Sequence, residues 1–159
     1  MKKLFTILVL GTVLVSCGQK KEPKKEGFEI NRNKIEKKVT TQKKEVPIDL
    51  DNKGVGPITS VKFDENIDAT LAATGEKKYN ALCTACHLPD KRLIGPALIG
   101  VYERRSPEWV MNMILNPDGM LKEDPIAKAL LIEYNNAQML NQNLKEEEAR
   151  AIAEYLRTL

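Results

Sequence analysis

Cys83-Thr84-Ala85-Cys86-His87 is the stretch that decides the fold of this 159-residue chain. Two thiols at this spacing lie one helical turn apart and can add to the two vinyl groups on one edge of a porphyrin. The next residue then places an imidazole beneath the ring, where its Nε2 can bind iron as the proximal ligand. C-x-x-C-H is accordingly the attachment pattern of covalent c-type haem. We predict one haem c, bound through Cys83 and Cys86, with His87 on the iron.

Two other chemistries also use closely spaced cysteines. A thioredoxin-like redox pair requires a different sequence context, and a zinc site requires further ligands. The chain has one His and three Cys in total. These counts favour the haem interpretation over a redox pair and over half of a zinc site.

The N-terminus has the pattern of an exported lipoprotein. Residues 1–3 are basic at two positions, and residues 4–15 form an apolar run that fits a signal peptide and is too short for a membrane-spanning helix. Residues 14–17, Leu-Val-Ser-Cys, resemble the lipobox of bacterial lipoproteins. We expect cleavage after residue 16 and acylation of Cys17, which would anchor the mature chain to a membrane on the periplasmic side of the cell envelope. The alternative is an ordinary secretory leader with an incidental cysteine.

A basic segment follows the leader. Residues 18–45 carry ten Lys and Arg against five Glu, with few apolar residues to offset the entropy of ordering. We predict that residues 17–45 form a disordered tether, which as a flexible coil would span roughly 30 Å. Its lysines either lie against anionic lipid headgroups or form a merely soluble spacer.

Helical periodicity begins near Asp68. Leu71, Gly75, Tyr79 and Leu82 recur at spacings of three and four residues and therefore share one helix face. A glycine inside a helix costs about 1 kcal/mol relative to alanine, so Gly75 predicts the close approach of another helix.

The end of the chain supplies that second helix. Glutamates at positions 146–148 lie in its first turn, where the helix dipole favours acidic side chains, although Lys145 occupies the expected cap position. Its apolar stripe consists of Ala149, Ile152, Ala153, Leu156 and Leu159, with Tyr155 beside it.

Two further helices are predicted between these ends. Ser106-Pro107 reads as an N-cap followed by proline at the first helical position, and this helix should continue to about Leu115. Asp124-Pro125 repeats the signal and begins another helix. Residues 46–67, by contrast, lack helical periodicity; we expect an extended segment that packs on the domain surface through Ile58, Val61 and Phe63.

The order of these motifs resembles that of class I cytochromes c. In that family a helix with a Gly-x-x-x-aromatic motif leads into C-x-x-C-H, and a Gly-Pro, a loop Met and a C-terminal helix follow. This resemblance implies an all-α fold, a small helical domain around one covalent haem, over residues 68–159. The matching residues are Gly75…Tyr79, Cys83…His87, Gly95-Pro96, Met139 and Ile152…Tyr155-Leu156.

The resemblance also suggests how the iron is held. It implies that the Pro96 carbonyl accepts the Nδ1–H of His87, which fixes the tautomer of the ring. Because the chain has one histidine, two His ligands from one chain are excluded. The family position implies Met139 as the sixth ligand; the alternatives are Met120, which lies in a predicted loop, and an open site.

Several side chains before and within the predicted 107–115 helix are candidates to hold the haem propionates. Trp109 and Arg104 are the main ones, with Arg105 and Tyr102 beside them. Each has an ordinary structural alternative: Trp109 as part of the core, and the arginines as solvated charges. Met111 and Met113 lie in the same helix, where core packing is their expected role.

These features predict an electron carrier and not an enzyme. Ligation by His and Met fills both axial positions, so the iron changes valence without binding a substrate. The alternatives are a haem-bearing subunit of a respiratory complex and a five-coordinate haem that binds or senses a gas. The chain is similar in style to small lipoprotein cytochromes of anaerobic respiration, including nitrous oxide reduction.

The charge distribution bears on partners. Residues 46–159 carry 13 Lys and Arg against 17 Asp and Glu, a net charge of −4, whereas the whole chain carries +3. A nucleic-acid partner is not indicated. We expect redox protein partners with a basic docking surface, and a lipid membrane bound through Cys17. We predict a local basic docking spot at Lys91 and Arg92, beside the haem loop.

Overall fold

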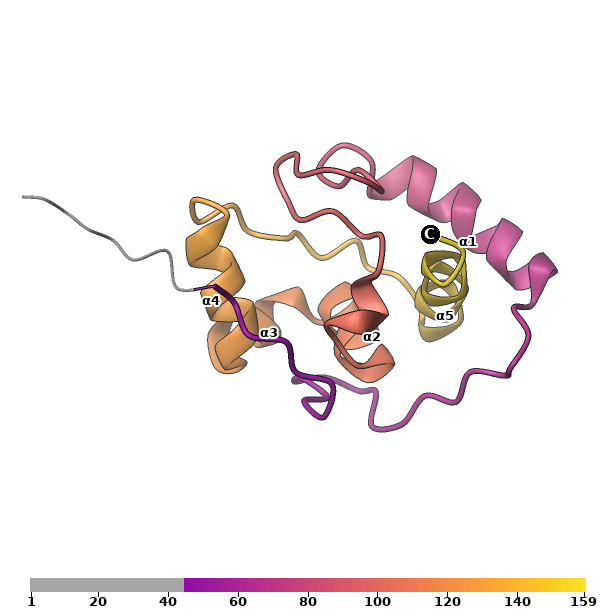
Figure 1. Ribbon diagram of the computed structural model, residues 1–159, viewed down its shortest axis with the longest axis horizontal. Coiled ribbons are helices and arrows are strands. Elements are labelled where there is room, and N and C mark those ends of the chain that lie inside the picture. Colours follow the sequence, from indigo (N-terminus) through magenta and orange to yellow (C-terminus); the bar gives the residue numbers. More distant parts are fainter. Residues whose placement is uncertain (1–44) are drawn as a thin grey trace, which may run out of the picture. The chain divides into compact units, whose positions relative to one another are not determined.

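The computed structural model describes residues 45–159 (Figure 1). The predicted leader, Cys17 and the tether up to residue 44 lie outside the described residues. Over the described range the all-α prediction is confirmed: no sheet is present, only an isolated bridge between Asp49 and Arg105. No helix in this range has the length and apolar character needed to span a bilayer. The elements are α1 (Ala69–Leu82), η2 (Val101–Glu103), α2 (Pro107–Leu115), α3 (Pro117–Glu123), α4 (Pro125–Glu133) and α5 (Glu146–Leu156).

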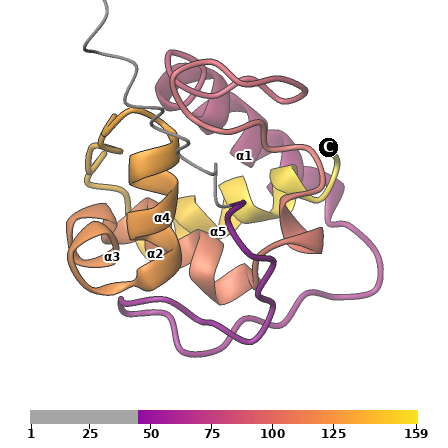
Figure 2. The ribbon, with the colours of Figure 1, turned by 60° about the vertical axis from the view of Figure 1, so that its left-hand side comes forward.

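Helices α1 and α5 pack against each other, and Gly75 sets how closely they approach (Figure 2). Gly75 is buried, and a Cβ at this position would collide with the backbone carbonyl of Ala151. The predicted close approach is therefore confirmed. Next to the contact, the Tyr79 and Tyr155 ring centroids lie 5.2 Å apart.

The ends of α1 and α5 follow from local hydrogen bonds. The Asp68 carboxylate caps α1 by accepting from the backbone N–H groups of Thr70 and Leu71. At α5 the side chain of Lys145 has no acceptor atom, and the Glu148 carboxylate instead accepts from the Lys145 N–H at 3.0 Å. That bond is half of a capping box, and it explains how the helix begins without a Ser, Thr or Asp cap.

Three short helices, α2, α3 and α4, follow one another, and each begins with a capping side chain followed by proline. Ser106 accepts from the N–H of Trp109, and Asp124 accepts from that of Ala127, as the sequence predicted for α2 and α4. Asn116 caps α3 in the same way, with Pro117 at the first helical position. The predicted loop around Met120 is therefore wrong: the residue lies within α3.

The segment before α1 packs against α2 and α3. Ile58 is buried, and Val61 and Phe63 pack against the core, as predicted. The side chain of Asn112, 1% exposed, accepts from the Ile58 N–H and donates to the carbonyls of Lys53 and Ile58 at 2.8 to 2.9 Å. The segment therefore packs on the helices through buried hydrogen bonds and through Ile58, its one buried residue.

Candidate functional site

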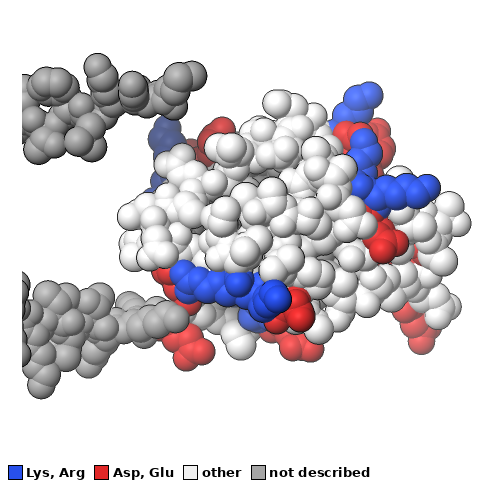
Figure 3. All heavy atoms as spheres, turned by 90° about the horizontal axis from the view of Figure 1, so that it is seen from above, with Lys and Arg blue, Asp and Glu red and all other residues white. Residues whose placement is uncertain are grey.

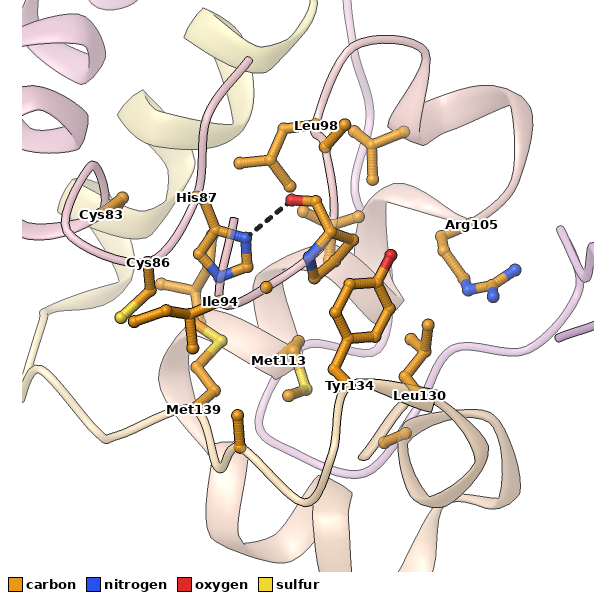
Figure 4. Close-up of a pocket in the computed structure, with 18 of the residues that line it drawn as sticks. Cys83, Cys86, His87, Ile94, Leu98, Arg105, Met113, Leu130, Tyr134 and Met139 are labelled. Atoms are coloured by element: carbon orange, nitrogen blue, oxygen red, sulfur yellow. Dashed lines mark hydrogen bonds between the residues drawn. The ribbon is translucent and has the colours of Figure 1, made fainter. Parts of the chain in front are cut away.

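A cavity of about 260 Å³ opens between α1, the loop before η2, and helices α2 and α4 (Figure 4). Its lining is almost entirely apolar, and among the described residues no Asp or Glu contributes to it. A cavity of this composition suits a large apolar ligand held by a few placed polar groups. The residues that matter most for its chemistry are Cys83, Cys86, His87, Arg104, Arg105, Met113, Tyr134 and Met139.

The C-x-x-C-H motif lies at the end of α1 and lines the cavity. Cys83 is the C-cap of α1, and its carbonyl accepts from the N–H groups of Cys86 at 3.1 Å and His87 at 2.9 Å. This turn keeps all three side chains beside the cavity. Both cysteines are free thiols, and burial, followed by the neighbouring Cys86, raises the pKa of Cys83 to about 11.

His87 takes part in two hydrogen bonds, one through its ring and one through its backbone carbonyl. Its Nδ1 lies 3.0 Å from the carbonyl oxygen of Pro96, and its own carbonyl accepts from the Tyr79 hydroxyl at 2.9 Å. A carbonyl can only accept, so Nδ1 carries the proton and Nε2 presents a lone pair. Nε2 makes no hydrogen bond with the described part of the chain. The ring is thus prepared to bind a metal through Nε2.

Gly95 lets the imidazole lie against the chain. A Cβ at this position would lie 2.8 Å from Nδ1 and 2.9 Å from Nε2 of His87. The Gly95 N–H also donates to the Cys86 carbonyl at 2.8 Å. Gly95-Pro96 therefore holds the histidine through contact and through hydrogen bonding.

The methionines differ in where their side chains lie. Met139 lines the cavity from the segment before α5, and its side chain points toward His87 (Figure 4). Met120 is completely buried, with its sulfur 2.9 Å from the Val55 N–H, away from the cavity lining. Met111 lies in the core, as predicted, whereas Met113 also lines the cavity. The geometry favours Met139 over Met120 and adds Met113 as a neighbour of the site.

A turn at the end of α4 directs the chain toward Met139. Asn135 and Asn136 both have φ of 59°, in the left-handed region, and the Asn136 N–H donates to the Leu131 carbonyl at 2.8 Å. Asparagine tolerates this conformation better than other residues with a side chain. The Asn-Asn pair is a signal for this turn that the sequence interpretation did not use.

Comparison with known proteins identifies the architecture. The family model for cytochrome c matches residues 72–159. The chain belongs to the cytochrome c family. Cytochrome c from Rhodothermus marinus is similar in structure, with a TM-score of 0.63 and 50% sequence identity over 65% of this chain and 88% of that chain. An engineered cytochrome c from the same organism, bound to a carbene intermediate, has a TM-score of 0.60 and the same identity and coverage. A search of curated proteins gave no match.

The site of this cytochrome fits one covalent haem c. An apolar cavity lies beside two free thiols and a histidine whose Nε2 is unused. A zinc site is not supported, since no group of three or more His, Cys, Asp and Glu within residues 45–159 is arranged to hold a metal ion. When bound, the haem supplies a one-electron couple at its iron.

The predicted propionate partners have different roles in the structure. Trp109 lines the cavity, but its indole N–H donates to the Asp124 carboxylate at 3.1 Å, so the predicted propionate donor is already engaged. Tyr102 donates its hydroxyl to the Ala153 carbonyl at 2.8 Å and does not line the cavity, so the structure does not place it with the other propionate candidates. Arg104 lines the cavity while donating to two carbonyls of the preceding loop, those of Ala97 and Ile99.

Arg105 is more deeply buried than Arg104, with 6% of its surface exposed. It donates to the carbonyls of Pro47 and Arg104, and its guanidinium lies 5.5 Å from the Trp109 ring centroid. Burial, followed by the charge of Arg104, lowers its pKa. A buried cation beside the cavity favours an anionic group there, so Arg105 belongs with Arg104 as a candidate to hold a propionate.

Proposed function

We propose that this protein is a membrane-anchored monohaem cytochrome c that passes single electrons between respiratory proteins, with His87 and Met139 as axial ligands. One observation carries the proposal: His87 and Met139 line the same cavity, and Met139 points toward the histidine (Figure 4). Ligation by His and Met raises the reduction potential and leaves no position for a substrate. The family as a whole consists typically of electron carriers that are not enzymes.

The side chains around the cavity suit outer-sphere electron transfer. The Pro96 carbonyl orients His87, and the apolar lining excludes water from the iron. Within residues 45–159 no carboxylate or second histidine lines the cavity to move protons to a bound ligand. The role of the protein in this proposal is to hold the haem and to present one edge of the haem to a redox partner.

The surface near the attachment loop supports contact with another protein. In Figure 3, uncharged residues cover the middle of the face at the top of Figure 1, and Lys, Arg, Asp and Glu side chains lie around its margin. The loop at this end carries the exposed side chains of Leu93, Ile94 and Ile99. Partners would meet an uncharged centre that includes these apolar side chains, with charged residues around it, and protein interfaces commonly have a polar rim of this kind.

Carbon monoxide tests the electron-carrier proposal against a five-coordinate gas-binding haem. We expect the reduced full-length protein to bind carbon monoxide slowly and incompletely, because Met139 must first leave the iron. Rapid and complete binding would favour the gas-binding alternative. Extraction in mild detergent separates a mobile carrier, which should run alone on a sizing column, from a fixed subunit of a respiratory complex.

The membrane anchor is proposed from the sequence of the leader, in which Cys17 completes a lipobox-like motif. Expression of wild type and Cys17→Ser in a bacterium that matures c-type cytochromes tests it. We expect wild type in the membrane fraction with an acylated N-terminus by mass spectrometry, and the variant in the soluble periplasmic fraction. An unacylated wild-type protein would contradict the anchor without affecting the haem site.

The most specific part of the proposal is a role in nitrous oxide or other nitrogen-oxide respiration. It is supported by the similarity of the sequence, in its overall organisation, to small lipoprotein cytochromes of anaerobic respiration. Stopped-flow mixing of the reduced protein with a purified nitrous oxide reductase provides the test. We expect oxidation of the cytochrome coupled to turnover; no oxidation while the reductase is active with an artificial donor would contradict it.

A further inference from the structure

Arg92 connects the two sides of the cavity. It lies in the loop that follows the C-x-x-C-H motif, and its Nη2 donates to the backbone carbonyl of Glu133 at 2.8 Å. Its guanidinium carbon also lies 4.1 Å from the centroid of the Tyr134 ring. One side chain thus makes a charged hydrogen bond and a cation–π contact with adjacent residues.

Both contacts are at the C-terminal end of α4, which suits a cation. The last carbonyls of a helix have no partner within the helix and carry partial negative charge, so a guanidinium there is favourable. Tyr134 is the C-cap of α4 and lines the cavity together with His87 and Met139. Arg92 therefore stabilises the point at which α4 gives way to the segment carrying Met139.

The segment around Met139 has few other long-range hydrogen bonds to the described part of the chain. The side chain of Asn141 donates to the Leu115 carbonyl across 3.4 Å, at the long limit for a hydrogen bond. Its neighbours Gln142 and Asn143 make hydrogen bonds only to nearby residues, Leu140 and Asn141. The turn at Asn136 and the packing of Met139 and Leu144 against the core also hold the segment. The contact of Arg92 with Tyr134 adds a side-chain restraint from the opposite side of the cavity at the point where the segment begins.

We propose that Arg92 is a positioning residue for the sixth iron ligand: by joining the His87 loop to Tyr134, it holds the Met139 segment over the cavity. This inference rests on the proposed function, in which Met139 binds the iron. It also gives Arg92 a different role from the docking spot predicted with Lys91, since its guanidinium is engaged within the domain.

Replacement of the ligand by imidazole in the oxidised holoprotein tests the proposal. The rate is followed by stopped-flow loss of the Met-to-iron charge-transfer band. Arg92 is exposed, so for Arg92→Ala we expect replacement to be faster by roughly fivefold, about 1 kcal/mol, the upper end for a cation–π contact at an exposed site. Tyr134→Leu should give a similar increase, and Arg92→Lys a smaller one because lysine lacks the planar guanidinium.

Two comparisons make the result decisive. Lys91→Ala, at the exposed neighbouring position, should leave the rate unchanged. The Arg92→Ala, Tyr134→Leu double variant should be no faster than Arg92→Ala alone, because that substitution already removes the contact with the Tyr134 ring. The proposal is overturned if the rate in Arg92→Ala stays within about twofold of wild type, or if the double variant shows additive increases.

The outcome for Met139→Ala distinguishes a failure of the Arg92 proposal from a failure of the proposed function on which it rests. If that variant keeps the charge-transfer band, Met139 is not the ligand and the proposed function fails. If it loses the band while Arg92→Ala exchanges ligand at the wild-type rate, the ligand assignment stands and only the positioning role of Arg92 fails.

Discussion

The carbonyl oxygen of Pro96 lies 3.0 Å from Nδ1 of His87, and this hydrogen bond leaves Nε2 of the ring as its metal-binding atom. The bond comes from the backbone, so no side-chain substitution removes it directly. Contact with Gly95 limits the position of the same ring. The backbone of this loop therefore controls both the tautomer and the orientation of the proximal histidine.

Gly95→Ala tests the contact. The added Cβ would lie 2.8 Å from Nδ1 of His87, closer than such atoms approach in proteins, so the ring or the loop must move. We expect the holoprotein to be destabilised by about 2 kcal/mol, as for other overpacked sites, and its reduction potential to change. Guanidinium unfolding and redox titration measure the two effects. Ile99→Ala, exposed in the same loop, is the control; equal behaviour of the two variants would contradict the contact.

Gly75→Ala tests the crossing of α1 and α5. The new Cβ would meet the Ala151 carbonyl, which is backbone and cannot rotate away, so the two helices must separate. We expect a loss of about 2 to 3 kcal/mol in the free energy of unfolding of the holoprotein. Thr74→Ala creates the same residue at the adjacent exposed position and should be nearly neutral. A neutral Gly75→Ala would show that the helices are not in close contact.

Asn112→Ala tests whether this side chain holds the segment before α1 against the helices. The substitution removes three hydrogen bonds and leaves the buried Ile58 N–H without its acceptor. We expect a loss of about 2 to 4 kcal/mol and faster amide hydrogen exchange in residues 53–58. Asn80→Ala, exposed on α1, is the control. Unchanged exchange in residues 53–58 would show that the amide does not hold the segment.

Glu154 gives a prediction about pH. Its side chain is fully buried and binds Arg150, Arg157 and the Asp68 N–H. Burial on its own would raise the pKa of Glu154, but the hydrogen bonds from Arg150 and Asp68 and the charges of both arginines hold it below the ordinary value. Such a carboxylate stabilises the fold above its unfolded pKa, and this contribution is lost as the pH falls through the folded pKa.

We therefore expect the wild-type free energy of unfolding to fall as the pH drops below 4.5, the ordinary value for the Glu154 carboxyl. Glu154→Gln should be destabilised by about 2 kcal/mol at neutral pH, because two half-buried arginines lose their charged hydrogen-bond partner. It should also show a weaker pH dependence below that value. Urea unfolding across the pH range measures both effects, with exposed Glu147→Gln as the control. Parallel pH profiles for wild type and Glu154→Gln would contradict the assignment.

Much of this fold is readable from the sequence because its signals are local. C-x-x-C-H needs only five consecutive residues, and the cap-proline pairs at Ser106 and Asp124 mark two helix starts correctly. Asn116-Pro117 carries the same signal, yet the seven-residue α3 was missed because its Gly119 resembled a loop residue. A short helix leaves little room for apolar periodicity, so the cap was the better guide.

The features that the sequence did not predict are long-range. Asn112 bonds to residues more than fifty positions earlier, and Arg92 contacts residues about forty positions later. A lone Asn or Arg has many possible roles, and no pattern in the sequence identifies the partner. The same reason explains Trp109 and Tyr102, whose polar atoms are occupied by Asp124 and by the Ala153 carbonyl.

The most direct test of His87 and Met139 as the axial ligands is the absorption spectrum of the oxidised full-length protein. Wild type, Met139→Ala, Met113→Ala and Met120→Ala are compared, each with its haem attached. We expect the Met-to-iron charge-transfer band in wild type and in the Met113 and Met120 variants, and its loss in Met139→Ala alone. A band that survives in Met139→Ala, or is absent from wild type, would contradict the proposed ligand pair.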